Sequence, residues 1–396
     1  MTERLYYTDS RVLDFSASVL EISERAEGYQ VILDRTAFYP SSGGQMHDTG
    51  ELGGVQVTEV HEADETIIHV LDRRPSFAAG DTVAGMIDAV RRRDNMQKHT
   101  GQHILSQALI VVCNAATVSS RLGEDDCTVE VNRESLTPEQ IRRAEELANV
   151  IIFENRPVMI SFVPFVGLGQ LPLRKIPERQ EGDYRIVTIR DFDCSACGGT
   201  HCEATGSIGI IKITGREKIR GNLRLHFLTG LMALDDYRWR FDQIEEVSAM
   251  FTRHGRETAA AVTALQEDNG LLRKKVADLK RELLPLQIDG LYRQAVEVNG
   301  LKVVALDLSG EDFKEARDAA LAIVNRYAAV VVAAADDKLL VAVSKELPTS
   351  AADILDGIVK RLGGRGGGSG QVAQGGGFTP ADLKVLLADP ARIFDR

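Results

Sequence analysis

The first ninety residues alternate apolar and polar side chains over short runs, which is the pattern of strands with one buried face. Glycine-rich turns separate the runs, which read ASVLEI, YQVILD, VQVTEV and TIIHVLD. Several short strands joined by tight turns are typical of a small all-β unit. We therefore expect residues 1–90 to form a β-barrel domain.

From residue 91 the apolar side chains recur at spacings of three and four, which predicts an amphipathic helix over residues 95–112. A second helix is predicted from residue 137, with Thr137 as its N-cap and Pro138 at its first position. The β-rich runs VMISFVPF and YRIVTIRDF follow. This mixture of helices and strands predicts an α+β domain over residues 91–236.

A long polar helix is predicted from residue 237, and residues 237–287 are expected to form a helical linker. Apolar side chains recur there at the a and d positions of four heptads, which indicates a coiled coil over residues 262–286. The seam consists of Val262, Leu265, Asn269, Leu272, Val276, Leu279, Leu283 and Leu286. It either pairs two chains into a homodimer or packs on residues 239–250 of the same chain. Pro285 is expected to end or kink the helix.

Residues 288–396 alternate strand-like and helix-like runs, which predicts a compact C-terminal α/β domain. The whole chain is thus expected to be an α+β multidomain protein. Its C-terminal part contains GGRGGGSGQVAQGGG, residues 363–377. Backbone N–H groups of such a tract can hold RNA phosphates, with Lys360 and Arg365 close by, although a flexible linker has a similar composition. The tract lacks the GK[ST] ending of a P-loop, so ATP binding is not expected.

The composition is that of a globular protein, with 44% hydrophobic and 27% charged residues. A formal net charge of −11 excludes an indiscriminate nucleic-acid binder, because phosphate contacts need Lys and Arg. Two basic stretches, RRRDNMQKH and KITGREKIRGNLRLHF, leave room for a local contact with RNA. The candidates are Arg91, Arg92, Lys218 and Arg220, although a solvated charged face is the more ordinary explanation of either stretch taken alone.

The N-terminal sequence has scattered charges and no apolar segment of signal-peptide length. No stretch approaches the length of a membrane span. We therefore expect a cytoplasmic protein without a membrane partner. Five cysteines in a chain of this length do not suggest a disulfide framework.

Three cysteines and a histidine crowd the stretch CSACGGTHCEATG, residues 194–206. Cys197 and His201 are four residues apart, and His99 and His103 are four apart on the predicted helix, where they share one face. One cysteine and three histidines form a donor set that suits zinc. Thr100 stands where a zinc protease has the glutamate of HExxH, so that class is disfavoured.

Spacing alone allows other sets of four ligands, because Cys194 and Cys202 flank the same motif. Residues adjacent in sequence rarely bind the same tetrahedral ion. We therefore leave Cys202 out of the expected ligand set and treat Cys194 as a spare thiol.

Three motifs resemble the editing domain of alanyl-tRNA synthetases and of the free-standing alanyl-tRNA editing proteins of the AlaX group: RTAFYPSSGGQMHDTG, HTGQHILSQAL and CGGTH. The glycine tract resembles the DHH-associated domain at the C-terminus of both. The resemblance covers essentially the whole chain. It implies zinc bound by His99, His103, Cys197 and His201, with the loop of residues 36–45 beside the site. Cys202 departs from the family pattern, which usually has an apolar residue after CGGTH.

The resemblance further implies a zinc-dependent hydrolase that deacylates tRNA(Ala) charged with serine or glycine. The aminoacylation portion of a synthetase is not expected, so editing would act in trans. An alanine pocket cannot exclude glycine and rejects a hydroxyl analogue only about 100-fold, so a second hydrolytic site is needed. Thr36 is our candidate partner for the serine hydroxyl and Gln45 the second, unless Thr36 caps a turn and Gln45 bonds to the backbone.

Two other functions remain open from the sequence. A closed set of four ligands is typical of structural zinc, so the chain is alternatively an RNA-binding dimer with a purely structural ion. An editing enzyme of the threonyl type is the third interpretation. No general base is identified from the sequence.

Overall fold

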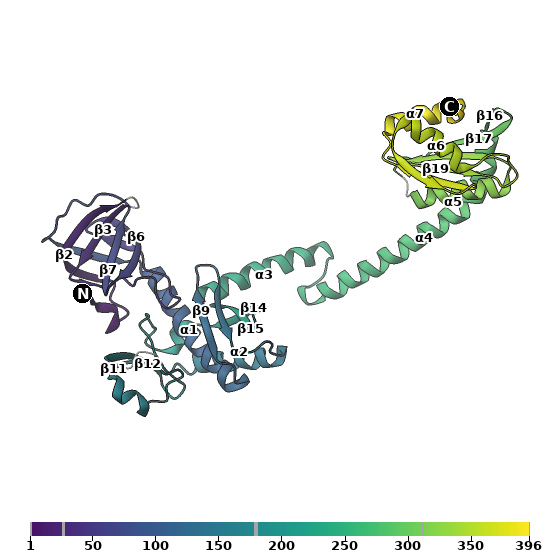
Figure 1. The fold of residues 1–396 in the computed structure, drawn as a ribbon. Helices are drawn as coiled ribbons and strands as arrows, with labels where there is room; N and C mark the ends of the chain where they lie inside the picture. The colour runs from purple at the N-terminus through teal and green to yellow at the C-terminus, as the bar shows by residue number, and fades with distance from the viewer. Residues whose placement is uncertain (1, 26–27, 178–180, 311–312, 396) are drawn as a thin grey trace. The chain divides into compact units, whose positions relative to one another are not determined.

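The computed structural model describes residues 2–25, 28–177, 181–310 and 313–395, shown in Figure 1. The chain divides into two compact units, Met1–Val247 and Ser248–Arg396, and each is described by itself. The first unit contains a barrel, helices, and two further sheets of three and four strands. The second contains a mixed sheet covered by helices on both faces.

The barrel is a closed ring of six strands. Its order is β2 (Asp14–Arg25), β3 (Gly28–Leu33), β7 (Thr66–Leu71), β6 (Val55–Ala63), β5 (Gly50–Leu52) and β8 (Thr82–Ile87). Alternate positions point inward, so Val31, Leu33, Val57 and Leu71 are fully buried in the barrel core. A short parallel pair, β1 (Glu3–Arg4) with β4 (Arg35–Thr36), holds the N-terminal segment against it.

Helix α1 (Ala89–Cys113) begins directly after the barrel, where Asp88 caps it by accepting hydrogen bonds from the N–H groups of Val90 and Arg91. Helix α2 (Pro138–Phe153) carries the N-cap expected from the sequence, and Thr137 and Gln140 complete a capping box. Both helices pack on an antiparallel sheet of order β14 (Ile211–Ile219), β15 (Asn222–Thr229), β10 (Cys127–Val131), β9 (Thr117–Leu122).

A second antiparallel sheet of three strands carries the cysteine-rich motif. Its order is β11 (Val158–Pro164), β12 (Asp183–Ile189) and β13 (Asp193–Ala196). Strand β13 ends at Ala196, so Cys197 begins the loop that follows. A short helix at residues 205–208 leads from this loop to β14.

The expectation of one continuous helix from residue 237 is wrong. Helix α3 (Gly230–Met250) ends before α4 (Thr258–Arg293) begins. Thr252 adopts a left-handed backbone with φ of 53°, which interrupts the helical hydrogen-bond pattern. Helix α4 does not end at Pro285, because Ile288 is buried in the core of the second unit and continues the helix beyond the proline.

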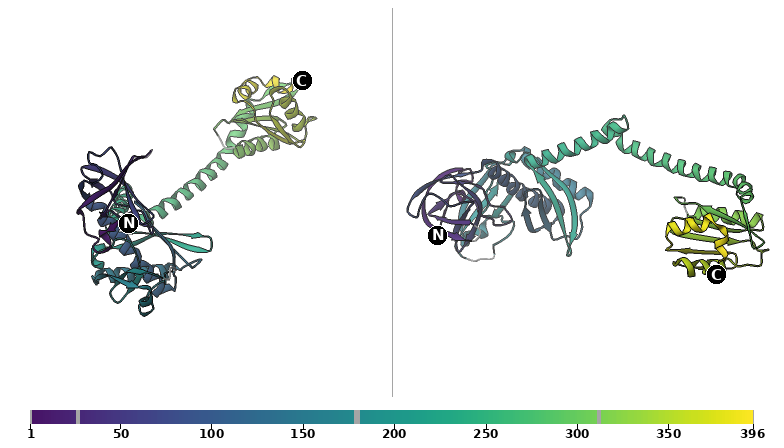
Figure 2. Two further views of the ribbon diagram at one scale, coloured as in Figure 1. Left: turned by 60° about the vertical axis from the view of Figure 1, so that its left-hand side comes forward. Right: turned by 90° about the horizontal axis from the view of Figure 1, so that it is seen from above.

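In the second unit a six-stranded sheet has the order β16 (Val296–Val298), β17 (Leu301–Asp307), β18 (Val330–Ala335), β19 (Lys338–Val343), β21 (Val372–Gly376), β20 (Arg365–Gly368). Alternate residues of β18 enter two different cores. One core includes α5 (Phe313–Arg326) and the other α6 (Ala351–Leu362) with α7 (Pro380–Ala388), so helices cover both faces (Figures 1 and 2).

The glycine tract is not a flexible linker. It forms the hairpin β20–β21, and β20 is the edge strand of the sheet. Several of its glycines pack closely: a Cβ on Gly368 would lie 2.3 Å from the Cα of Ala373. Across the described part of the chain, no helix has the length and apolar character to cross a membrane.

Candidate metal centre

Four side chains from two distant segments converge in the first unit. His99 and His103 lie one helical turn apart on α1, and Cys197 and His201 lie in the loop after β13. Their ligand atoms all lie within 4.8 Å of one another. The Sγ of Cys197 is 3.3 Å from the Nε2 of His99 and 3.3 Å from the Nε2 of His201.

This cluster has the dimensions of a zinc site. Zn–S and Zn–N bonds of about 2.3 and about 2.0 Å at a tetrahedral angle separate sulfur from nitrogen by roughly 3.6 Å. The observed distances are close to that value. The three histidines are only 3–4% exposed, whereas Cys197 is partly exposed. One thiolate with three buried imidazoles fits a zinc ion.

An outer set of hydrogen bonds fixes the orientation of each imidazole. The Nδ1 of His99 lies 2.7 Å from Oε1 of Gln45, and the Nδ1 of His103 lies 3.1 Å from Oδ2 of Asp193. With a proton on Nδ1, each ring donates outward and keeps its Nε2 lone pair for a metal.

His201 is oriented in the same way by a hydroxyl group. Its Nδ1 lies 3.2 Å from the Oγ1 of Thr100, which also accepts the backbone N–H of Cys202 at 3.0 Å. A threonine oxygen has two lone pairs and can accept both hydrogen bonds. Thr100, which stands where an HExxH motif has its glutamate, therefore orients His201.

The protonation of the cluster favours metal binding. Burial opposes the thiolate of Cys197, but the three surrounding imidazoles outweigh it and hold its pKa well below 9.0. Burial lowers the pKa of His201 to about 3. Metal ligands must be deprotonated, and both shifts favour the deprotonated form.

Asp193 keeps its negative charge beside His103. Burial opposes the charge, but the hydrogen bond from His103 and the positive charge of Arg174 lower the pKa of Asp193. Burial likewise lowers the pKa of His103, yet the Cys197 charge and the Asp193 hydrogen bond raise it overall. The hydroxyl of Ser195 also donates to Asp193, at 3.1 Å. The Asp193 carboxylate therefore interacts with His103, Ser195 and Arg174 at once.

Gln45, the second candidate partner for the serine hydroxyl, contacts His99 of the cluster. Besides accepting from His99, its Oε1 accepts the backbone N–H of Thr200 at 3.1 Å, and its Nε2 donates to the Thr200 hydroxyl at 2.9 Å. Gln45 is 2% exposed. The side chain therefore ties the barrel loop to the metal-binding loop.

Thr36 ends the short strand β4, outside the closed ring of the barrel, and is fully buried. The Nδ1 of His69 donates to the carbonyl of Val31 at 3.0 Å, so its Nε2 accepts from the Thr36 hydroxyl at 2.8 Å. The Thr36 oxygen also accepts the N–H of Phe38 at 3.1 Å, which is the turn-capping role considered as the alternative. Within the described residues no hydrogen bond joins Thr36 to the four clustered side chains.

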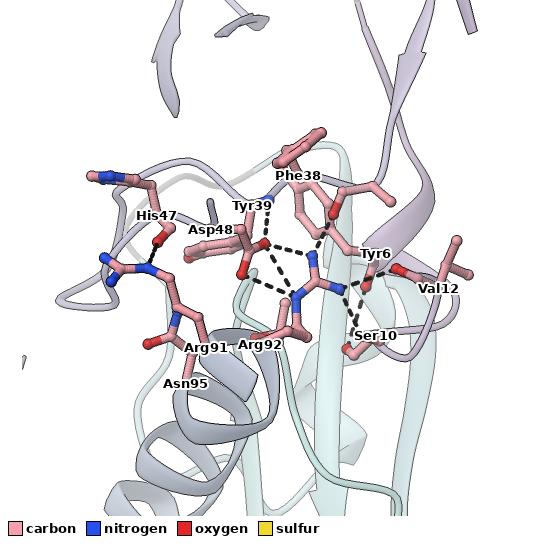
Figure 3. A network of polar contacts seen from close by, with 12 residues as sticks. Tyr6, Ser10, Val12, Phe38, Tyr39, His47, Asp48, Arg91, Arg92 and Asn95 are labelled. Atoms are coloured by element: carbon pink, nitrogen blue, oxygen red, sulfur yellow. Dashed lines mark hydrogen bonds and ion pairs between the residues drawn. The ribbon is translucent and has the colours of Figure 1, made fainter. Parts of the chain in front are cut away.

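The expectation that Arg92 contacts RNA is wrong, because its side chain is 1% exposed. Figure 3 shows its guanidinium enclosed by acceptors. It binds the buried carboxylate of Asp48, with Nη2–Oδ2 at 2.5 Å, and donates to the carbonyls of Ser10, at 2.7 Å, and Ala37. The arginine run therefore contains a structural ion pair that joins α1 to the barrel.

The other basic candidates are placed differently. Arg91 is largely taken up by the carbonyl of His47, at 2.9 Å, and by Glu124, at 2.8 Å. Lys218 and Arg220 are exposed near the turn between β14 and β15. In the second unit, Arg365 is exposed on β20 and Lys360 is exposed beside Asp356, with a separation of 2.6 Å.

All five cysteines are free thiols, and two that flank the motif lie outside the cluster. Cys194 accepts a hydrogen bond from the Thr188 hydroxyl at 3.6 Å and packs with Leu168 and Ile186. Cys202 packs in the main core of the unit, and burial raises its pKa to about 11.

The orienting roles of Thr100, Asp193 and Arg174 were not predicted from the sequence. Asp193 directly precedes the cysteine-rich stretch, and this position was the only feature of the sequence that pointed to a role for it at the site. Its partner His103 is 90 residues away along the chain, so their contact depends on the packing of β13 against α1.

Two family models match the chain. The model described as tRNA synthetases class II (A) matches residues 2–91, which include the barrel. The model described as threonyl and alanyl tRNA synthetase second additional domain matches residues 184–225, which include Cys197 and His201.

Similar proteins include two alanine–tRNA ligases. The ligase of Haloquadratum walsbyi is 31% identical over 99% of this chain and 44% of its own length, and that of Pyrococcus furiosus is 32% identical over 94% and 42%. The chain thus spans less than half the length of these ligases. The solved C-Ala domain of Aquifex aeolicus alanyl-tRNA synthetase aligns with 24% of this chain and 96% of its own, with 27% identity and a TM-score of 0.22.

A relative of matching length is the alanyl-tRNA editing protein AlaX-L of Pyrococcus horikoshii. It is 30% identical over an alignment of 410 positions, gaps included, which covers 100% of this chain and 97% of the relative. The similarity therefore extends over both chains from end to end, and the chain belongs to the family of alanyl-tRNA editing proteins.

Proposed function

We propose that the protein is a zinc-dependent hydrolase that removes serine or glycine from mischarged tRNA(Ala) in trans. The convergence of His99, His103, Cys197 and His201 within 4.8 Å is the observation that carries the proposal. Membership of the alanyl-tRNA editing family supports the substrate class. A tRNA substrate also agrees with a cytoplasmic location.

When bound, zinc supplies Lewis-acid chemistry: it lowers the pKa of a water molecule or polarises the ester carbonyl. The residues of the chain supply the geometry. Gln45, Asp193 and Thr100 hold the imidazoles, and the oxygens of Asp193 are engaged by His103, Ser195 and Arg174. Asp193 is therefore assigned to ligand orientation and not to general-base catalysis.

Serine recognition is assigned to Thr36 on β4. Because the proton of the Thr36 hydroxyl is directed to His69, the Thr36 oxygen keeps one lone pair for an incoming donor. The serine hydroxyl is such a donor, and the alanine side chain is not. Gln45 is assigned to holding His99 rather than to the substrate.

The test is a deacylation panel on Ser-, Gly- and Ala-tRNA(Ala), together with Ser-tRNA(Thr), with and without chelator. We expect hydrolysis of the serine and glycine esters of tRNA(Ala), loss of activity with chelator, and loss of both zinc and activity in His99→Ala and His103→Ala. Thr36→Val should slow hydrolysis of Ser-tRNA(Ala) more than that of Gly-tRNA(Ala). Zinc-loaded protein that hydrolyses none of the tRNA(Ala) esters would overturn the proposal.

A second candidate function is an RNA-binding protein with structural zinc, and the closed set of four ligands favours it. Thermal melting separates the two functions. If the ion is structural, chelation should unfold the region of residues 91–236. If it is catalytic, chelation should abolish deacylation with only a modest loss of stability. Preferential hydrolysis of Ser-tRNA(Thr) in the panel would instead indicate editing of the threonyl type.

We assign tRNA contact to the β14–β15 hairpin and to the C-terminal domain, residues 288–396, as a DHH-associated domain. Lys218 and Arg220 are exposed, and the described residues include no carboxylate paired with either. Lys218→Glu with Arg220→Glu should weaken tRNA binding and flatten its salt dependence by about one slope unit for each phosphate that is no longer neutralised. Arg142→Glu with Arg143→Glu on α2 changes the net charge equally and serves as the control.

A homodimer through residues 262–286 is also proposed. The seam is exposed on α4, with Leu265, Leu272 and Leu279 at 55%, 62% and 47% exposure. Asn269 at an a position is typical of two-stranded coiled coils, where it fixes the register.

A further inference from the structure

Arg185 on β12 is a buried cation beside the proposed metal centre. It is only 6% exposed, and none of the carboxylates in the described residues forms an ion pair with it. The sequence analysis did not single it out, and neither the ligand cluster nor the orienting hydrogen bonds described above include it. A charge in this position requires an explanation.

The guanidinium group holds two separate segments at once. Its Nη1 donates to the carbonyl of Cys197 at 2.7 Å, and its Nε donates to the carbonyl of Tyr7 at 2.8 Å. The group also lies 5.5 Å over the Tyr7 ring. In return, the backbone N–H of Cys197 donates to the carbonyl of Arg185 at 3.0 Å. Both backbone polar groups of Cys197 are therefore held by one residue.

The N-terminal segment supports the same loop at two further points. The Tyr7 hydroxyl lies against Gly198, where an added Cβ would be 3.3 Å from it. The backbone N–H of His201 donates to the hydroxyl of Ser10 at 3.2 Å. Arg185 thus belongs to a brace that fastens the metal-binding loop to residues 7–10.

Stability alone does not explain a charge here. A buried cation without a carboxylate partner loses its hydration, and an apolar side chain of similar volume is often at least as stable. The Nη2 of Arg185 has no hydrogen-bond partner among the described residues, which adds to the cost. Burial lowers the pKa of Arg185, and the negative charge of Cys197 acts against this shift.

We propose that Arg185 is a positioning residue for the metal centre, which fixes the backbone of Cys197 so that its sulfur meets the three imidazoles. The inference rests on the proposed metal centre. Arginine is required because its planar fork reaches two carbonyls on different segments. A lysine ammonium on a flexible chain keeps the charge but cannot hold that geometry.

The test uses full-length Arg185→Lys and Arg185→Met loaded with cobalt(II) in place of zinc. We expect the thiolate-to-cobalt charge-transfer band to weaken or shift, and zinc to be lost to a competing chelator about 10- to 100-fold more readily than from the wild type. Arg185→Lys keeps the charge and most of the volume, so it decides the outcome if the Met variant does not fold.

Arg156→Lys is the matched control. Arg156 also donates to two carbonyls, of Arg190 at 3.2 Å and Asp191 at 2.8 Å, and lies 5.8 Å over the Phe192 ring, but it touches no ligand. It should behave as the wild type. An unchanged band and zinc affinity in Arg185→Lys would overturn this inference alone. A wild-type protein that takes up cobalt without a thiolate band would overturn the metal centre itself.

Discussion

At the scale of single residues, buried histidines differ in which nitrogen remains free. The three clustered histidines keep Nε2 toward the Cys197 sulfur, because their Nδ1 atoms are engaged elsewhere. His69 is equally buried, but its Nε2 accepts the Thr36 hydroxyl. Burial lowers the pKa of His69 to about 4 from an ordinary 6.5. The ring is therefore a neutral structural group of the barrel.

His69 should make the protein less stable in acid. Its folded pKa lies below its unfolded pKa, so below pH 6.5 the unfolded state binds the proton more readily. The contribution of the neutral His69 ring to the free energy of unfolding is fully present above pH 6.5. It is lost as the pH drops toward 4. We expect His69 to account for a loss on the order of 2 to 3 kcal/mol at about pH 4.5.

The measurement compares denaturant unfolding of the wild type and His69→Gln at about pH 7 and about pH 4.5, with chelator present so that metal release affects neither. The variant should lose less stability on acidification. His254→Gln removes an exposed histidine and should follow the wild type. Equal acid losses in the wild type and His69→Gln would argue against a neutral buried ring.

The four side chains of the cluster could be proposed from the sequence, whereas the residues that orient them could not. The spacing of four residues in HxxxH and CxxxH can be read directly from the sequence. A set of nitrogen and sulfur donors is typical of zinc sites. The bonds of His103 to Asp193 and of His201 to Thr100 join residues 90 and 101 apart. Arg92, the second arginine of RRR, was predicted to be a surface charge because its partner Asp48 is also distant in sequence. In the structure Arg92 is buried in an ion pair with Asp48.

At the scale of elements, the second glycine of CGGTH, Gly199, is required by close packing. A Cβ on Gly199 would lie 2.1 Å from Cε1 and 2.2 Å from Nδ1 of His99, and 3.0 Å from Oε1 of Gln45. Neither glycine of the pair has a positive φ. The loop therefore needs glycine here for space beside a ligand and not for backbone freedom.

Gly199→Ala should displace His99 and cost the protein its metal. Gly198→Ala is the matched control, because its Cβ meets only the Tyr7 side chain, with 3.3 Å to the hydroxyl oxygen, and needs a small adjustment. Zinc content after dialysis and the rate of deacylation should fall sharply in Gly199→Ala and remain near the wild-type values in Gly198→Ala. Similar metal retention by both variants would show that the loop tolerates the added methyl group.

Element boundaries were predictable where local chemistry sets them. Thr137 and Pro138 mark the start of α2 because the cap is made by neighbouring residues. The gap between α3 and α4 was not predicted, because residues 251–257 contain no proline and their left-handed Thr252 is not encoded by its residue type. The continuation of α4 past Pro285 depends on the burial of Ile288 against another element.

At the scale of the whole molecule, each unit has its own buried apolar clusters, and the seam on α4 is a row of exposed apolar side chains. Its d positions are occupied by leucine throughout, from Leu265 to Leu286. In water an exposed leucine row of this length favours burial against a matching surface. A second copy of the same helix presents such a surface, because identical heptads interlock knob into hole.

Leu272→Lys with Leu279→Lys should therefore convert the proposed dimer into a monomer. Each substitution places a charge at a d position, where pairing would bury two like charges against each other. Leu271→Lys with Val385→Lys is the control, since Leu271 is 67% exposed beside the seam and Val385 is 51% exposed on α7, away from it. Sedimentation equilibrium measures the mass of each protein. A wild type that sediments as a monomer of 43.3 kDa at all concentrations would assign the seam to a contact within one chain.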